Sequence, residues 1–285
     1  LRFGSPDDKK TKHLFNGVIS GISSYGNCIG VPDVGGEVNF HNSYNNNPLV
    51  NAMCIGLIEN GKYMSASAKH HGDLLLLVGS DTGRDGIHGA SVLASRSFEK
   101  EPELRSTVQV GNPFMEKNLI EACLESISVS GVNGLQDCGA AGLTSAAIEM
   151  ANRSNMGLII DVDRVPRRET NMTAYEVMLS ESQERMLLAI NPKSVKTVTK
   201  IFMKWDLDAT VIGEFTKGSE VVIKDKNCAL SKTPINILTD PPLYHSKTKK
   251  PHWISKLQSK TSCLDPPNNL PAEDIFLKLL GSINI

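Results

Sequence analysis

The chain has 285 residues, of which 40% are hydrophobic and 21% are charged, proportions typical of globular proteins. Its 30 Lys and Arg residues against 31 Asp and Glu residues exclude a global charge that would attract nucleic acid or an anionic membrane. No apolar run approaches the roughly 20 residues of a membrane-spanning helix, and no signal peptide begins at Leu1. We therefore expect a cytoplasmic protein with no nucleic-acid or membrane partner.

The first sixty residues predict a short strand and a loop, then a helix. The helix is capped by Thr11 or Asp8, runs to about Ser24 and ends at Gly26. A short strand, a Pro/Gly turn and a second strand are expected over residues 28–38. The apolar run 48–58 contains one amide, Asn51, which we expect to be a satisfied interior or strand-face side chain.

Asn60-Gly61 is a turn signal and the first candidate domain boundary. A buried strand is predicted over residues 73–79, followed by a Gly-rich loop (residues 80–90) that also contains two carboxylates, an Arg and a His. Such a loop after a strand either lines a phosphate or ligand site or is a tight surface loop. This segment alone leaves both alternatives open.

A second helix is predicted from Phe114 to about Ser128, because Asn112 and Pro113 suit the N-cap and first helical positions. Gln109 lies just ahead of this helix. We expect its side chain at the mouth of the fold.

Residues 134–145 indicate the end of a buried strand, a turn of small residues and the start of a helix that runs to about Arg153. Asp137 lies at the hinge, and backbone N–H groups follow it with few side chains in their way. The stretch is either a tight connection with a helix-capping Asp or a site for a metal ion or phosphate. Local sequence does not decide between the two.

The second half alternates predicted strands, at 158–162, 186–190, 210–215 and 220–224, with helices at 174–179 and 193–205. Thr173 is the candidate cap of the first of these helices. Between them stands the polar run (residues 180–185), which must face solvent or meet a polar ligand if it is not to be buried unpaired. The order indicates an α+β or α/β layer fold with helices on one side of a sheet. From residue 239 the composition becomes linker-like, with a short helix at 272–280.

The six cysteines include no Cys-x-x-Cys pair, and the seven histidines show no ligand spacing. We interpret the cysteines as reduced thiols rather than disulfide or zinc ligands. The adjacent His70 and His71 indicate a solvated turn.

Several motifs, in order along the chain, resemble the first half of the phosphoribosylformylglycinamidine synthase family, in its synthetase subunit of the small bacterial type. The matching segments are residues 26–37, 47–53, 82–90, 108–117, 134–145 and 178–186. The resemblance runs from Leu1 to about Thr216 and continues loosely through the tail. Long motifs in the family's order are more specific than any one glycine loop.

The resemblance implies an ATP-dependent amidotransfer in purine biosynthesis, catalysed by a C–N ligase. ATP activates the amide oxygen of formylglycinamide ribonucleotide, and ammonia then displaces the phosphoryl group to give formylglycinamidine ribonucleotide. In this family type a separate glutaminase subunit supplies the ammonia, and a small accessory subunit helps to assemble the complex.

The resemblance further implies that Asp137 is a magnesium ligand, and that Gln109, Glu181, Ser182 and Gln183 contact the substrate. Mg²⁺ prefers hard oxygen ligands and takes few of them from protein, with phosphates and water completing its shell. Its implied role is to neutralise charge that develops on the transferred phosphoryl group.

The family's catalytic histidine, an ATP-contacting lysine and further metal carboxylates are expected before Leu1, and its second half after the tail. We therefore expect a fragment with a partial N-terminal-type domain (residues 1–60), a complete C-terminal-type domain (61–238), and a linker with a short helix (239–285). It would hold no catalytic residue and would be inactive alone. An exposed sheet edge in the first domain would allow a homodimer.

Two other functions stay open. One is another ATP-dependent enzyme of the same superfamily, such as aminoimidazole ribonucleotide synthetase, selenophosphate synthetase or thiamine phosphate kinase. The other is a non-catalytic scaffold module that has kept the fold.

Overall fold

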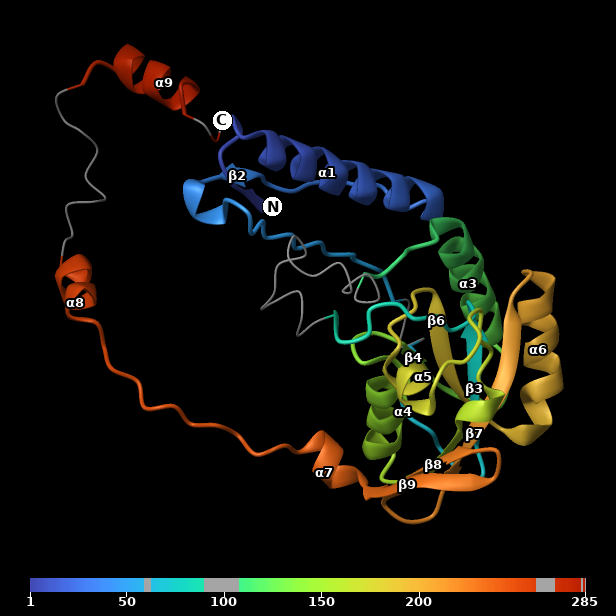
Figure 1. The fold of residues 1–285 in the computed structure, drawn as a ribbon. Helices are drawn as coiled ribbons and strands as arrows, with labels where there is room; N and C mark the ends of the chain where they lie inside the picture. The colour runs from blue at the N-terminus through green and yellow to red at the C-terminus, as the bar shows by residue number, and fades with distance from the viewer. Residues whose placement is uncertain (59–62, 90–107, 260–269, 283, 285) are drawn as a thin grey trace. The chain divides into compact units, whose positions relative to one another are not determined.

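The computed structural model describes residues 1–58, 63–89, 108–259, 270–282 and 284. The chain divides into two units, which we treat separately. The smaller comprises Leu1–Ser23, Asp33–Ile55 and Pro242–Ile285, and the larger Ser24–Pro32 and Gly56–Pro241. Figure 1 gives the elements of both.

A seven-stranded sheet forms the centre of the larger unit, with the strand order β4-β6-β3-β7-β5-β8-β9. Neighbouring strands are antiparallel except β5 and β8, which are parallel. The predicted strands are confirmed as β3 to β8, whereas β9 was not predicted because its sequence has no alternating apolar pattern and its residues are mostly exposed. The strands are β3 Leu74–Gly79, β4 Val132–Asp137, β5 Gly157–Asp161, β6 Arg185–Ile190, β7 Asp208–Thr216, β8 Glu220–Asp225 and β9 Cys228–Pro234.

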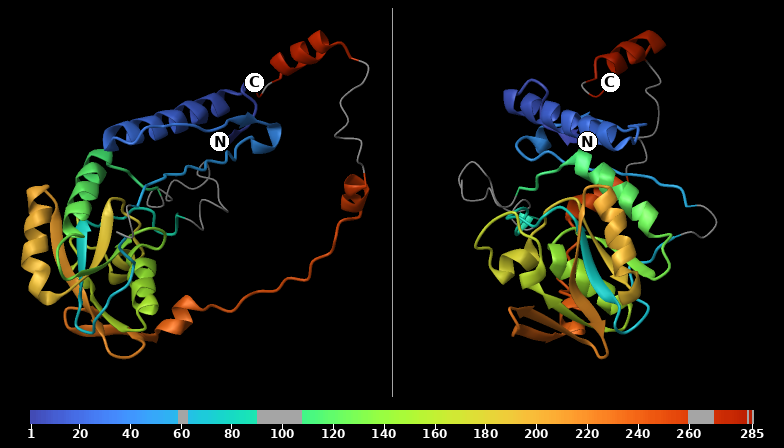
Figure 2. Two further views of the ribbon diagram at one scale, coloured as in Figure 1. Left: turned by 180° about the vertical axis from the view of Figure 1, so that it is seen from behind. Right: turned by 90° about the vertical axis from the view of Figure 1, so that its right-hand side faces the viewer.

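Helices cover both faces of this sheet, so the prediction of helices on one side was wrong. In β3, Leu75 and Leu77 face one core, while Leu76 and Val78 face the other. This explains the unbroken apolar run of β3, because a strand that is covered on both faces has no solvent-facing positions for polar residues. The first face carries α4 (Gly142–Arg153), α5 (Ala174–Leu179) and α7 (Ile235–Thr239), and the second carries α3 (Pro113–Ser126) and α6 (Val195–Lys204), as Figure 2 shows.

The predicted caps of α3 and α5 are confirmed. The Asn112 side chain accepts a hydrogen bond from the Met115 N–H, with Pro113 at the first helical position. Thr173 and Glu176 form a capping box at the start of α5. Single 3₁₀ turns lie at η3 Val162–Arg164 and η4 Pro192–Ser194. Helix α4 instead begins after Ala141, which has a φ of +59° and makes no side-chain cap, so Asp137 is not the helix cap.

The smaller unit contains the parallel pair β1 (Arg2–Phe3) and β2 (Asn39–Phe40), with η1 (Asn42–Tyr44) after β2. The rings of Phe3, Phe15 and Phe40 pack together with centroids 5.2 to 6.3 Å apart.

Three predictions for the first sixty residues were wrong. Helix α1 (Lys9–Ile29) is capped by Asp8 but continues past Gly26 to Gly30, whose φ of +79° ends it. Residues 31–38 therefore form no strand, and the second strand starts at 39. Residues 50–58, including Asn51, are exposed rather than interior. Asn60-Gly61 lies outside the described residues.

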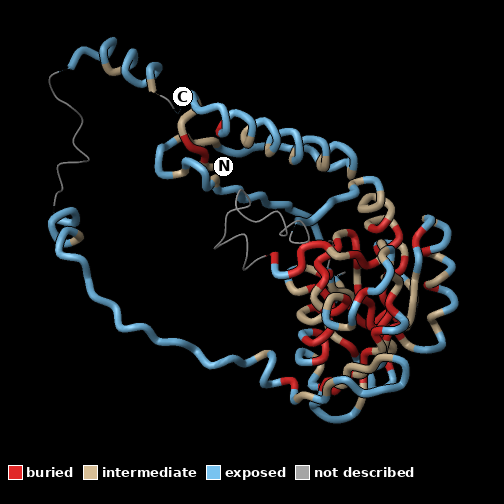
Figure 3. Tube along the Cα trace, in the orientation of Figure 1, coloured by how far each residue is buried: buried red, intermediate tan, exposed pale blue. Residues whose placement is uncertain are grey.

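The tail holds α8 (His252–Gln258), which was not predicted, and α9 (Ala272–Leu280), which was. Figure 3 shows that residues 242–258 are almost entirely exposed, in contrast to the sheet. Across the described residues, no helix combines the length and apolarity needed to cross a membrane.

Five cysteines fall among the described residues, and all are free thiols. Cys123 and Cys138 are buried, and burial raises their thiol pKa to about 12 and about 11, respectively. His70 and His71 are exposed in a turn, as predicted.

Gly79 and Gly218 have nearly the same positive φ, +102° and +104°, so an alanine would strain the backbone equally at both positions. The two positions differ in the space available for a side chain. A Cβ on Gly79 would stand 2.1 Å from the Glu184 carbonyl oxygen, whereas a Cβ on Gly218 would meet nothing within 4 Å. We expect Gly218→Ala to lower the unfolding free energy by about 1 kcal/mol and Gly79→Ala by about 3 kcal/mol or more. Urea denaturation measures both, and equal losses would contradict the close packing of β3 against residue 184.

Candidate functional site

The polar run lies inside the larger unit, at the end of the sheet where β3 and β4 finish and β6 begins. All of its residues are buried except Gln183, which is partly exposed. From the sequence, the polar groups of this run were expected to face solvent or to meet a ligand. This expectation was wrong for most of them, because they form hydrogen bonds with other parts of the protein. A polar group buried without a partner would cost about 1–3 kcal/mol of folding free energy.

Two serines of the run join it to the Gly-rich loop. The Ser182 hydroxyl accepts from the Gly83 N–H at 2.9 Å and donates to the Asp85 carboxylate. The Ser180 hydroxyl donates to the Gly83 carbonyl at 2.6 Å. Ser182 is fully buried, so its side chain points into the protein and its hydrogen bonds are satisfied there.

Arg185, the last residue of the polar run, bonds to the backbone of the run and to the Gly-rich loop. Its guanidinium donates to the Ser182 carbonyl at 2.9 Å, to the Thr82 hydroxyl at 2.9 Å and to the Ser180 carbonyl at 2.5 Å. Burial lowers the pKa of Arg185 from its usual value. The charge is thus held by neutral oxygens that fix the backbone of the run.

Glu181 and Gln109 are brought together by the fold. Gln109 Nε2 donates to Glu181 Oε2 at 2.7 Å, and the Ala141 N–H donates to Glu181 Oε1 at 2.9 Å. Glu181 is 3% exposed, while Gln109 is exposed. Among the residues that the structure describes, nothing hydrogen-bonds to the Gln109 side-chain oxygen, which is therefore free to accept from a ligand. The Gln183 amide donates to the Glu181 carbonyl at 2.7 Å.

Gly86 makes this contact possible. Its φ is +63°, and a Cβ there would stand 2.5 Å from Glu181 Cβ and 3.0 Å from Gln109 Cγ. Any other residue would separate the two side chains.

Asp137 lies at the exposed end of β4, as predicted. Gln136 Nε2 donates to Asp137 Oδ1 at 2.9 Å, and Arg153 donates to the Gln136 side-chain oxygen at 2.7 Å. Within the described ranges Asp137 Oδ2 makes no hydrogen bond, so it can serve as a hard oxygen ligand. Those ranges contain no group of three or more His, Cys, Asp or Glu placed to hold a metal. A magnesium ion held by Asp137 would have to take its other ligands from elsewhere, such as phosphate and water.

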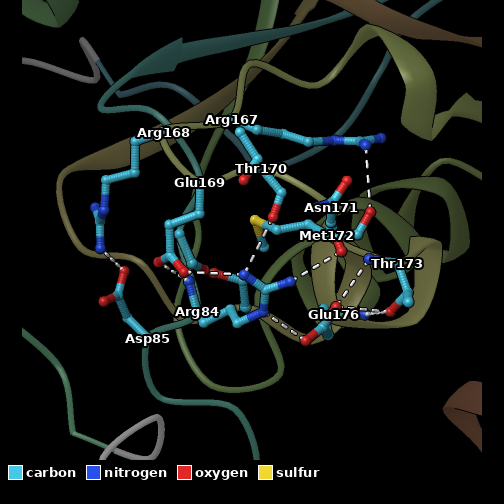
Figure 4. Close-up of polar contacts among 12 residues, drawn as sticks. Arg84, Asp85, Arg167, Arg168, Glu169, Thr170, Asn171, Met172, Thr173 and Glu176 are labelled. Atoms are coloured by element: carbon cyan, nitrogen blue, oxygen red, sulfur yellow. Dashed lines mark hydrogen bonds and ion pairs between the residues drawn. The ribbon is translucent and has the colours of Figure 1, made fainter.

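An ionic cluster that sequence reasoning missed ties the Gly-rich loop to residues 167–176 (Figure 4). Arg84 donates to Glu176 at 2.7 Å and to Glu169 at 3.1 Å, and Arg168 pairs with Asp85. Hydrogen bonding from Arg84 lowers the pKa of Glu176 to about 2 and also lowers that of Glu169. The partners lie more than 80 positions apart, and the only signal in the sequence is a short charged segment, residues 165–170, which contains two Arg and one Glu.

The described part of the Gly-rich loop is not a surface loop. Thr82, Gly83 and residues 85–87 are buried, so that alternative was wrong. Its role in lining a ligand site stays a prediction.

A separate open hollow of about 650 Å³ runs along α4 and is lined on its other side by Leu238, Thr239 and Pro241. Its polar lining residues, among them Glu149 and Arg153, are on the surface and include none of the predicted site residues.

Two family models match the chain. The model of the AIR synthase related protein C-terminal domain matches residues 70–226, and that of the N-terminal domain matches residues 1–58.

Among curated relatives, phosphoribosylformylglycinamidine synthase subunit PurL of Caldanaerobacter subterraneus subsp. tengcongensis is 47% identical over all of this chain and 39% of its own length. The same subunit of Zymomonas mobilis is 52% identical over 99% of this chain and 38% of its own length. The chain thus spans about two fifths of the length of these relatives.

Solved structures of Thermotoga maritima PurL are also similar. That complexed with FGAR is 38% identical with a TM-score of 0.75, covering 83% of this chain and 40% of its own. That complexed with ATP is 36% identical with a TM-score of 0.72, covering 82% and 37%. The structure of PurLQS is 33% identical with a TM-score of 0.71, covering 88% and 40%.

The Arg84–Glu176 pair predicts a pH-dependent stability. Because folding lowers the pKa of Glu176 from 4.5 to about 2, the pair stabilises the folded state above pH 4.5, and this is lost as the pH falls toward 2. We expect Glu176→Gln to lower the unfolding free energy by about 1–2 kcal/mol at pH 7 and the difference from wild type to vanish near pH 2.

Urea unfolding of both proteins between pH 7 and pH 2 measures this. Glu149→Gln, which removes an exposed pair with Arg153 one helical turn away, is the control and should cost only about 0.3–0.5 kcal/mol. A Glu176→Gln difference that stays constant with pH would contradict the assignment.

Proposed function

This chain belongs to the AIR synthase related protein family, and we propose that it forms part of an ATP-dependent C–N ligase of purine biosynthesis. The reaction converts formylglycinamide ribonucleotide (FGAR) to formylglycinamidine ribonucleotide with ammonia from glutamine. Relatives at 47–52% identity that carry the name phosphoribosylformylglycinamidine synthase support this proposal. So does the likeness to the Thermotoga maritima protein complexed with FGAR.

The observation that carries the proposal is the contact between Gln109 and Glu181. These residues are 72 positions apart, yet their side chains meet at 2.7 Å beside the end of the sheet. Gln109 presents an unused carbonyl oxygen that can accept from an amide or hydroxyl of the substrate. Gln183 stands partly exposed beside them. Ser182, whose hydroxyl is bonded inside the protein, contributes by holding this segment in place.

ATP is the second substrate in this proposal, and Mg²⁺ its metal ion. Asp137 would supply one carboxylate oxygen to the ion, held in orientation by Gln136 and Arg153. The metal, when bound, neutralises phosphoryl charge. The likeness to the Thermotoga maritima protein complexed with ATP supports the nucleotide.

We propose a glutaminase subunit and a small accessory subunit as partners, and the cytoplasm as the location. The similarity to the PurLQS structure supports the partners. A homodimer remains a prediction. We propose no counterpart in this chain for the catalytic histidine that the resemblance implies, so ligand binding rather than turnover is the quantity to measure.

The alternatives are distinguished by ligand. A scaffold module would bind neither FGAR nor ATP, and another enzyme of the superfamily would bind ATP but not FGAR.

Gln109→Ala should weaken FGAR binding about tenfold, because one substrate hydrogen bond and the contact with Glu181 are lost. Isothermal titration calorimetry of the 285-residue chain measures the affinity. Gln258→Ala, an exposed glutamine of α8, is the matched control and should bind as wild type does. The proposal fails if the wild-type chain does not bind FGAR, or if Gln109→Ala binds it equally well.

Asp137→Asn should reduce the enhancement of ATP binding by Mg²⁺ about tenfold or more, because an amide is a poorer ligand for a hard cation. Titrations with ATP across a range of Mg²⁺ concentrations measure the effect. Asp225→Asn, at the end of β8 near the far edge of the sheet, is the control. Unchanged magnesium dependence in Asp137→Asn would remove Asp137 from the metal site.

A further inference from the structure

Glu184 joins three segments that are far apart in the sequence. Its Oε1 accepts from the Tyr25 hydroxyl at 2.8 Å and from the Asn112 N–H at 2.9 Å. Its backbone carbonyl accepts from the Ser80 N–H at 2.9 Å. Glu184 is 7% exposed and has a φ of +56°. A left-handed backbone at a non-glycine residue persists only where surrounding contacts impose it.

Both side-chain hydrogen bonds of this buried carboxylate come from neutral donors, the Tyr25 hydroxyl and the Asn112 N–H. No Lys or Arg of the described ranges forms an ion pair with Glu184. Asn112, which donates to it, is the N-cap of the 14-residue helix α3. A helix N-terminus carries a partial positive charge that favours an anion within its first turn. Burial and the bond to Glu184 raise the pKa of Tyr25, so its hydroxyl remains a donor.

The contact between Glu184 and Asn112 lies three positions along the chain from the contact between Glu181 and Gln109, in both of the segments that meet. Glu181 and Glu184 are three positions apart, as are Gln109 and Asn112, and each carboxylate binds one member of the second pair. Gly111 lies between, where a Cβ would stand 3.1 Å from the Tyr25 ring. Residues 109–112 are therefore held at both ends, at Gln109 by Glu181 and at Asn112 by Glu184.

We propose that Glu184 is a positioning residue, which acts with Tyr25 to fix the Gln109 segment against Glu181 for substrate binding. The effect on substrate binding rests on the proposed function, whereas the role of Glu184 in holding residues 109–112 does not. A segment tied only at Gln109 would pivot about the Glu181 contact. The Gln109 oxygen would then spend less time where a substrate can reach it, which weakens binding by loss of preorganisation.

The test compares Glu184→Ala with Glu184→Gln. The amide keeps an oxygen acceptor in place and should preserve FGAR affinity within about threefold, whereas alanine removes it and should weaken binding about tenfold. Hydrogen exchange of residues 108–114, measured without ligand, should rise in Glu184→Ala only. Glu121→Ala, which removes a partly exposed carboxylate of α3 that pairs with Lys117, is the control and should change neither quantity.

Gly111→Val provides a second route that leaves the Glu184 residue itself unchanged. A Cβ at this exposed position would stand 3.1 Å from the Tyr25 ring and 3.7 Å from Glu184 Oε1, so the larger side chain would push the ring away from the carboxylate. This variant should also raise exchange in residues 108–114 and weaken FGAR binding, and it carries the test if Glu184→Ala does not fold. Unchanged exchange, faster exchange with unchanged affinity, or equal damage from Glu184→Gln would each overturn the proposal. Failure of the wild-type chain to bind FGAR would instead contradict the proposed function, and the exchange result would still stand.

Discussion

The site depends on one constraint, which is that the polar run 180–185 is buried and must find its hydrogen bonds within the protein. Burying these groups unpaired would cost more than a domain's net stability can bear. Each pairing fixes a neighbouring segment. Ser180 and Ser182 hold the Gly-rich loop, Glu181 holds Gln109 and the turn before α4, and Glu184 holds the start of α3.

The sheet gives this network a rigid support. Strand β3 is central, paired with β6 on one side and β7 on the other, and apolar cores cover both of its faces. The polar run leads directly into β6, and Asp137 ends β4 on the other side of β6. The predicted substrate and metal residues therefore share one end of the sheet. Their geometry is set before any ligand arrives, which reduces the entropic cost of binding.

Much of the larger unit was predictable because local patterns and tertiary packing agree there. Apolar runs located β3 to β8, and capping residues such as Asn112 and Thr173 located the starts of helices. Prediction failed where burial depends on distant partners. The edge strand β9 has no apolar pattern, and the apolar residues 50–58 are exposed in spite of theirs.

The candidate site was predictable only in part, and the prediction came from the family resemblance rather than from local patterns. The resemblance selected Gln109, Glu181 and Asp137, and the fold brings the first two into contact. It did not reveal that Ser182 faces inward, or that Arg84 and Asp85 pair with residues more than 80 positions away. Hydrogen bonds between distant side chains leave no periodic trace in a sequence.

A crystal structure of the chain with bound FGAR would show whether the contact between Gln109 and Glu181 forms the substrate site. We expect FGAR against the Gln109 side-chain oxygen, with Glu181 still bonded to Gln109 and the Ser182 hydroxyl still bonded to Asp85. FGAR bound elsewhere, for example in the hollow along α4, or a Ser182 hydroxyl turned outward to meet it, would exclude this site.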